Sequence, residues 1–300
     1  MSTNLTYIDG NLLEDVTRVV VNISPIDTPV LSSIGKTRAY NTLHQWPIDS
    51  LASRANSPIV EGTTVTYTAV AAPTRVTNYT QLMSKTYAVS SAERSVKGAG
   101  VDDMFIYQKG RALKELANNM EYALLTATSS AGTATEARQM KGLLSFIATN
   151  ASVVVSGTKL TESLFVGLLQ IAWAQGGNPD TVWVGSYMKR AITAFTTGGT
   201  RFVDASSKKL TANVSVYESP FGIVEVELSR DVPNTDLAAV VVCVERSRLK
   251  MAILDPVTVK DPSEVAQTIY GSNGYVFTEI SLEVGNEAGL SKGTGYTTSI

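Results

Sequence analysis

The chain of 300 residues has one cysteine and one histidine, which limits the chemistry open to it. A single cysteine excludes an intrachain disulfide and fits a reducing cytoplasmic origin. Cys243 lies in the apolar run AAVVVCVE, so we expect a small buried hydrophobe. A zinc site would need almost all-carboxylate ligands, because His44 has no second histidine and no nearby cysteine. We therefore predict no metal and no cofactor, and expect His44 to be hydrogen-bonded near Trp46.

The chain also lacks the short motifs of common enzymes. It has no GxSxG elbow, no P-loop and no GxGxxG, and the glycines near Thr197 and Thr294 are turn-like. A Ser–His–Asp triad would depend wholly on His44. We therefore predict no catalytic residues, and a carboxylate-only hydrolase stays open as an alternative.

Charge and long apolar runs are scarce as well. Only 17% of residues are charged, the net charge is −2, and no basic run suggests avid binding to DNA phosphates. No apolar run approaches the ~20 residues of a membrane span, and the N-terminus lacks the features of a secretory signal. Few charges lower the desolvation cost when broad surfaces meet. Composition thus favours large interfaces, although a Thr-rich β protein that does not assemble also fits it.

What the chain does have is a long stretch, 37–100, that is rich in Thr, Ser, Val and Tyr. It predicts extended arms that enclose no core of their own. Strands over 63–70 and 75–89 predict a long hairpin with its tip at 71–73. A lone two-stranded ribbon is only marginally stable in water, so this one needs a partner surface. Upstream, a short helix is expected around Leu12–Val20, followed by an arm that its prolines hold extended.

A long amphipathic helix is predicted from Asp102 to about Thr128, with Asp102 and Asp103 as caps. Its expected apolar face holds Ile106, Leu113, Leu116, Ala117, Met120 and Leu124. The charged residues expected off that face are Lys109, Lys114, Glu115 and Glu121.

From Val153 onward the pattern predicts a compact α/β subdomain. The expected elements are a helix from N-cap Thr161 to Gly176, a buried strand TVWVG, a helix over 186–198, a hairpin turning at Pro220–Gly222 and a core strand AAVVVCV. In the hairpin, Val224, Val226 and Leu228 should face the core. A long half-exposed strand, YVFTEISLEV, is then expected to cross back to the first part of the chain.

The order arm, long hairpin, long helix, compact α/β subdomain and returning strand resembles tailed-bacteriophage major capsid proteins of the Hong Kong 97 (HK97) type. The segments NISPIDTPVLSSIG, LHQWPIDSL, NYTQLMSKTYAVS, ELANNMEYALL, VYESPFG and TEISLEVGNEAG resemble the podophage SU-ten-like major head protein family. They span the whole chain and keep the family's order.

This resemblance implies an α+β fold of the HK97 type with named parts. Residues 1–48 would be the N-arm and 49–84 the E-loop. Residues 85–150 would be the peripheral (P) domain with its spine helix, 151–241 the axial (A) domain, and 242–300 the return to the P domain.

The resemblance further implies a major capsid protein that self-assembles into hexamers and pentamers of an icosahedral shell around phage double-stranded DNA, without sequence-specific binding. The implied partners are a portal protein, a separate scaffolding protein and a decoration or cement protein. The implied location is the virion, after assembly in the cytoplasm of a bacterial host. The alternative is the shell protein of a bacterial encapsulin-type nanocompartment. No site residues carry over, because the family has no active site.

Two departures from the fold's namesake matter. No lysine lies between Lys36 and Lys85, so the Lys–Asn crosslinking of that namesake is not expected. No long charged helical prefix precedes the arm, so scaffolding is expected from a separate chain.

Two groups of residues are candidates for interface contacts. Residues proposed for ion pairs between subunits, with solvated surface equally open, are Arg54, Glu61, Arg75, Glu93 and Arg94. The tryptophans Trp46, Trp173 and Trp183 are expected in core or interface packing.

Overall fold

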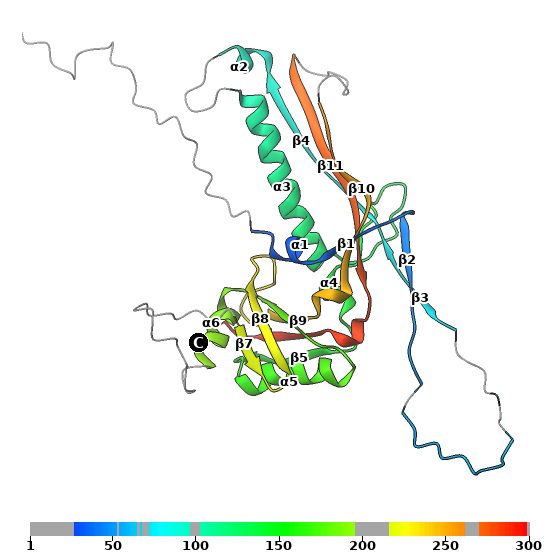
Figure 1. Cartoon of the computed structure of the whole chain (residues 1–300). Helices are drawn as coiled ribbons and strands as arrows, with labels where there is room; N and C mark the ends of the chain where they lie inside the picture. Colours follow the sequence, from blue (N-terminus) through cyan, green and yellow to red (C-terminus); the bar gives the residue numbers. More distant parts are fainter. Residues whose placement is uncertain are drawn as a thin grey trace, which may run out of the picture. The chain divides into compact units, whose positions relative to one another are not determined.

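The computed structural model describes residues 27–52, 54–64, 67, 72–96, 103–195, 216–261 and 270–298 (Figure 1). The helices are α1 (Pro29–Ser33), α2 (Ser91–Ser95), α3 (Met104–Thr126), α4 (Leu143–Phe146), α5 (Glu162–Ala174) and α6 (Ser186–Phe195), with 3-10 turns η2 (Arg246–Arg248) and η3 (Glu287–Gly289). The strands are β1 (Gly35–Arg38), β2 (Leu43–Ile48), β3 (Thr74–Tyr79), β4 (Gln81–Ser90), β5 (Ala151–Thr158), β6 (Thr181–Val184), β7 (Val216–Ser219), β8 (Gly222–Leu228), β9 (Ala239–Val244), β10 (Leu249–Lys260), β11 (Gly271–Val284) and β12 (Ser291–Tyr296). Within these ranges no helix is long and apolar enough to cross a membrane.

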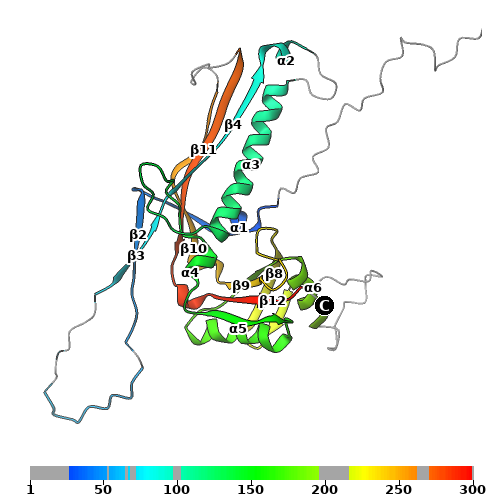
Figure 2. The ribbon, with the colours of Figure 1, turned by 180° about the vertical axis from the view of Figure 1, so that it is seen from behind.

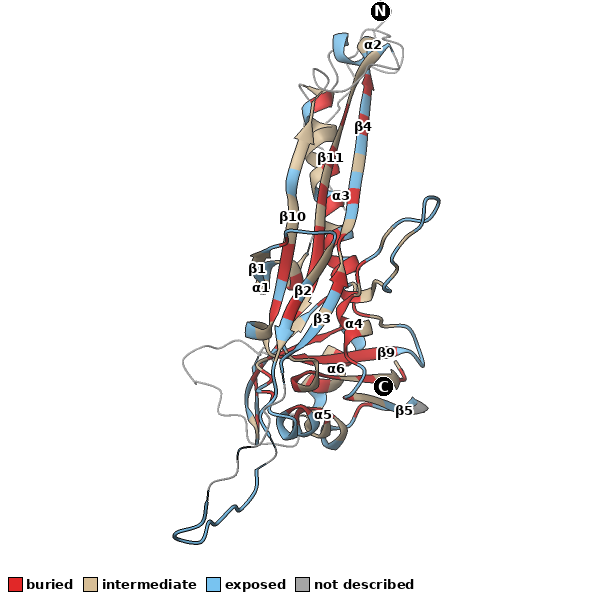
Figure 3. Cartoon of the chain, turned by 90° about the vertical axis from the view of Figure 1, so that its right-hand side faces the viewer, coloured by how far each residue is buried: buried red, intermediate tan, exposed pale blue. Residues whose placement is uncertain are grey.

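The chain divides into two compact units. The first includes residues 84–116 and 258–277, and the second includes 27–83, 117–257 and 278–298. Strands β1, β10, β11 and β4 form a four-stranded sheet in that order. Buried and exposed residues alternate along the middle and end of β4, as expected for a strand with one covered face (Figure 3).

In the first unit, the start of α3 lies beside β4 (Figures 1 and 2). The carboxylate of Asp103 caps the helix by accepting the N–H of Phe105 at 2.8 Å. The Phe105 ring packs on Tyr87, with ring centroids 5.2 Å apart. The Lys109 ammonium binds the Asp261 carboxylate at 2.9 Å, which also accepts the Tyr87 hydroxyl.

In the second unit, a six-stranded sheet runs in the order β5-β12-β9-β6-β8-β7. Strands β6 and β9 are buried along their whole length, as the apolar runs predicted. Helices α5 and α6 pack on one sheet face, and the shared core includes Phe165, Leu168, Met188, Ile192, Val182, Val184, Val224, Val226, Val241, Cys243 and Tyr296. Thr161 caps α5 as predicted, and Gly176, with φ +80°, follows its end.

The predicted long hairpin has a different partner strand. Strand β3 pairs antiparallel with β2, with Trp46 opposite Val76. Thr63, Thr64 and Tyr67 are not in a strand, and the rest of 65–71 lies outside the described residues. The returning strand also breaks at Thr80 into β3 and β4, which belong to different sheets. Alternation predicted strands but could not choose between two candidate partners of similar composition.

Part of the stretch 37–100 is buried within its own chain, although the sequence predicted that it would need a neighbouring subunit. Trp46, Asn78, Met83 and Tyr87 are buried, because β2 to β4 pack on other parts of the chain. The arm is also not wholly extended, since Pro29 occupies the first turn of α1, where its missing N–H costs nothing. The helix expected around 12–20 lies outside the described residues.

Three finer predictions from helix and strand periodicity were also wrong. Ile106, near the start of α3, is 65% exposed, and Glu121, expected off the apolar face, is fully buried. On β8, Val224 and Val226 are buried as predicted, but Leu228 is 48% exposed. The helix predicted over 186–198 is described as far as Phe195.

Candidate assembly surfaces

The loop that joins β2 to β3 is the most exposed apolar segment of the second unit. Every described residue from 49 to 73 is exposed (Figure 3). Leu51 is 97% exposed and Tyr67 94%, and Ile59 and Val60 lie next to a turn that Gly62 makes with φ +82°. Monomeric soluble proteins bury most side chains of this kind, so a run of them marks a surface made for contact.

The root of this loop is held firmly in the second unit. The Trp46 indole N–H donates to the Val284 carbonyl at 2.9 Å, and the ring is buried. The Asn78 side chain donates to the carbonyls of Leu282 and Lys141 and accepts the Lys141 N–H, at 2.7 to 3.1 Å. These bonds satisfy a buried amide and fix the direction in which the loop leaves.

His44 completes the root, as the sequence predicted. Its Nε2 lies 3.0 Å from a carboxylate oxygen of Glu283, and its ring centroid is 5.5 Å from that of Trp46. At the far end of β3, the Arg138 guanidinium donates to the Thr80 carbonyl at 2.7 Å and pairs with Glu279. Both ends of the hairpin root therefore have polar anchors.

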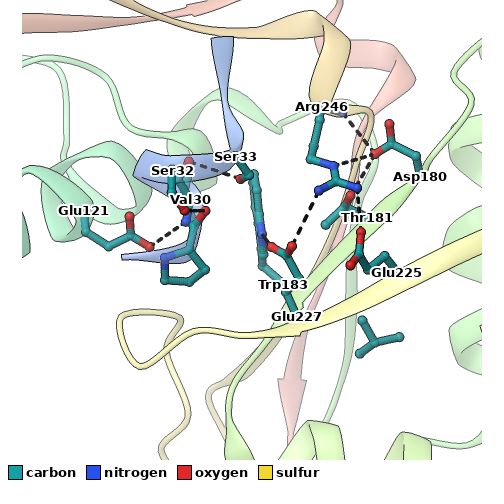
Figure 4. A network of polar contacts seen from close by, with 12 residues as sticks. Val30, Ser32, Ser33, Glu121, Asp180, Thr181, Trp183, Glu225, Glu227 and Arg246 are labelled. Atoms are coloured by element: carbon teal, nitrogen blue, oxygen red, sulfur yellow. Dashed lines mark hydrogen bonds and ion pairs between the residues drawn. The ribbon is translucent and has the colours of Figure 1, made fainter. Parts of the chain in front are cut away.

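A buried carboxylate holds the arm that precedes β1. Glu121, on α3, accepts the N–H of Val30 at 3.0 Å and of Leu31 at 2.7 Å (Figure 4). Burial raises the pKa of Glu121, while these two hydrogen bonds act to lower it and the negative charges of Asp231 and Glu227 act to raise it further. The sequence showed only a glutamate beside an apolar helix stripe, so the anchor could not be identified there.

Arg246, in the 3-10 turn η2, lies close to three carboxylates. Its guanidinium lies 2.7 Å from Glu225, 3.5 Å from Glu227 and 3.8 Å from Asp180 (Figure 4). Glu227 also accepts the indole N–H of buried Trp183 at 2.8 Å. These three carboxylates therefore pair with an arginine of the same chain. Among the described residues, no group of His, Cys, Asp or Glu is placed to hold a metal ion.

The remaining residues singled out from the sequence lie as follows. Trp46 and Trp183 are core residues as predicted. Trp173 is 56% exposed, and its ring lies tilted against that of Phe221, with centroids 5.8 Å apart. Cys243 is buried, and burial raises the pKa of its thiol to about 12, so it is inert as a nucleophile.

The five charged residues proposed for contacts between subunits are all exposed. Arg94 contacts its own chain, at 2.8 Å to the Ser272 hydroxyl and 3.9 Å to Asp103. For the other four, the described part of the chain provides no ion pair.

Comparisons with known proteins agree with this arrangement. A family model described as the SU10 major capsid protein matches residues 1–297. The major capsid protein of Escherichia phage Phieco32 is 30% identical over 105 residues, which is 35% of this chain. That match spans only 30% of the relative's own length.

Solved structures share the fold at low sequence identity. A chain of the holo-SrpI encapsulin complex from Synechococcus elongatus PCC 7942 matches with a TM-score of 0.64 and 12% identity, over 100% of this chain and 98% of the other. A chain from the capsid of a native GTA particle matches with a TM-score of 0.70 and 12% identity, over 98% and 99%. The predicted α+β capsid fold of the HK97 type is therefore confirmed.

Proposed function

This chain belongs to the SU10 major capsid protein family, and we propose that it is the repeating subunit of a phage head shell. It would form hexamers and pentamers that close into an icosahedral shell around double-stranded DNA. In this role the chain is structural and not an enzyme. The observation that carries the proposal is the exposed apolar loop 49–73 on a buried, hydrogen-bonded root.

We assign the parts of the chain on the same basis. Residues 1–48 serve as N-arm, 49–84 as E-loop, 85–150 as P domain, 151–241 as A domain and 242–300 as the return to the P domain. Two features support this assignment: the loop leaves from β2 and returns at β3, and β5 to β9 lie in one sheet with α5 and α6. The boundary at 84 falls inside β4, and β3 begins at Thr74, so the part of the E-loop before the returning strand would end at residue 73.

The loop gains its burial only on a neighbour. Several hundred Å² of apolar surface, at ~25 cal/mol per Å², would contribute several kcal/mol per loop before ordering costs. One such contact is weak, but every subunit of a closed shell repeats it, so the contacts become collectively stable. A net charge of −2 limits repulsion between copies and keeps DNA from adhering strongly to the inner wall.

The further partners follow from the family. We propose a portal protein, a separate scaffolding protein and a decoration or cement protein, with assembly in the cytoplasm of the bacterial host. Expression of the chain with and without its scaffolding protein, followed by negative-stain microscopy, tests the shell itself.

The role of the loop is tested by changing only its exposed apolar residues. Leu51, Ile59, Val60 and Tyr67 are replaced together by serine, which leaves β2 and β3 intact. We expect a folded, soluble chain that forms no shells. The matched control replaces the exposed polar residues Asn56, Thr63 and Thr64 by serine and should assemble normally. Normal shells from the apolar variant would refute this role of the loop.

The second candidate function is the shell of an encapsulin-type compartment, which the similarity to the SrpI encapsulin chain favours. The contents of purified particles decide between the two. A phage head forms with a scaffolding protein and is later filled with DNA, whereas a compartment forms alone and encloses a cargo enzyme.

A further inference from the structure

An apolar pocket opens on the second unit at the end of α6. It has a volume of about 250 Å³, and its apolar lining comes from Leu160, Met188, Ala191 and Phe195. Lys159 lies at its rim, exposed, and within the described residues it has no ion partner. An apolar cavity with one cation at its edge is suited to an apolar side chain that brings an acidic neighbour.

The β7–β8 hairpin presents such a pair. Ile223 is 68% exposed, and the register places Glu218 directly opposite it across the two strands. Facing residues in an antiparallel pair have Cβ atoms about 5 Å apart, so the isoleucine and the carboxylate form one feature. Glu218 is exposed, and the described part of the chain offers it no cation.

The two features belong to opposite edges of one sheet. Lys159 and Leu160 directly follow β5, the first strand of the six-stranded order, whereas β7 is the last strand. Ile223 is exposed, so it does not fill the pocket of its own chain. A second copy of the chain can supply the missing partner at each edge.

We infer that Ile223 of one copy enters the Leu160–Phe195 pocket of the next, and that Glu218 pairs there with Lys159. This inference rests on the proposed function and names the contact between neighbouring A domains. The contact joins two different surfaces, and such head-to-tail contacts generate closed rings when the rotation closes. The charge pair sets direction, because two like edges would place acid against acid.

A charge exchange tests the pairing. Glu218→Lys and Lys159→Glu are made singly and together, with Glu136→Lys as control at another exposed glutamate of the second unit. We expect each single variant to lose rings and shells at least tenfold, the control to assemble like wild type, and the double variant to recover assembly. Single variants that assemble like the control would overturn the pairing.

A disulfide tests the contact independently of charge. Ile223→Cys and Ala191→Cys are combined in one chain, where native Cys243 is buried and does not interfere. Assembled particles are oxidised and run on non-reducing gels. Linked chains should appear only in the double variant and disappear with reductant.

The two experiments also separate this inference from the proposed function. If wild-type shells form but neither charge exchange nor oxidation has an effect, the contact is wrong and the shell role stands. If the wild type forms neither rings nor shells with its scaffolding protein, both ideas fail.

Discussion

Removing the Glu121 carboxylate should detach the arm at α1 from helix α3. Glu121 accepts two backbone N–H groups from α1, and its side chain is fully buried. In Glu121→Ala both bonds are lost, and the Val30 N–H stays in a buried position without an acceptor. An ordinary hydrogen bond contributes ~0.5–1.5 kcal/mol, and an unsatisfied buried donor costs ~1–3 kcal/mol.

These values predict a loss of about 3 kcal/mol in the local stability of the arm, because part of the cost is relieved when the arm moves into water. A loss of that size corresponds to roughly a hundredfold change in the opening equilibrium, at 1.36 kcal/mol per factor of ten. Amide hydrogen exchange of residues 29–33 measures that opening directly. The control is Glu115→Ala on the same helix, whose carboxylate is half-exposed and pairs with Arg111 at 2.9 Å. Exposed pairs of this kind contribute only ~0–1 kcal/mol.

The pH dependence gives a second measurement of the same carboxylate. Burial raises the pKa of Glu121 in the folded chain, so the folded state holds this proton more tightly than the unfolded state. The stability from this group is therefore full below the unfolded pKa of about 4.3 and is lost as the pH rises through the folded pKa. As the pH rises through the folded pKa, the free energy of unfolding of the wild type should fall relative to that of Glu121→Gln, which does not titrate. Unchanged exchange of the arm in Glu121→Ala, or a pH-independent difference from Glu121→Gln, would refute the reasoning.

Three further outcomes are expected. Trp46→Ala should lower the free energy of unfolding by about 3–5 kcal/mol in urea titrations, because it leaves a cavity at the buried root of the loop. The exposed control, Trp173→Ala, should change it by less than about 1 kcal/mol. The Lys109 ammonium lowers the pKa of Asp261, so its stability contribution is lost as the pH falls, and Asp261→Asn should flatten the acid limb of a stability–pH curve. Mature particles should show no ladder of crosslinked chains on reducing SDS gels, because the E-loop has no lysine, and a ladder would contradict that expectation.

Elements with local signals could be predicted from the sequence. The ends of α5 were predicted to within a few residues from the Thr161 cap, the apolar stripe that follows it and Gly176. The apolar runs of β6 and β9 are buried throughout. The α3 helix was predicted for the same reason. Each of these elements is specified by residues within about one helix or strand length.

Features that depend on distant residues could not be predicted in this way. Trp46 on β2 and Asn78 on β3 donate to the carbonyls of Val284 and Leu282, more than 200 residues away. The burial of Glu121 likewise depends on α1, some 90 residues earlier in the chain. Neither partner is encoded in the periodicity of the segment itself.

The loop and the arm differ in what stabilises them. Each is a segment with too little apolar area to form a core alone. The arm satisfies two of its backbone N–H groups on a buried carboxylate of its own chain. The loop root instead donates side-chain N–H groups, those of Trp46 and Asn78, to carbonyls of β11. The described part of the loop beyond the root instead exposes Leu51 and Tyr67 almost completely. Because the root fixes where those residues project, a neighbour can bury them without the entropy cost of locating a free-moving chain.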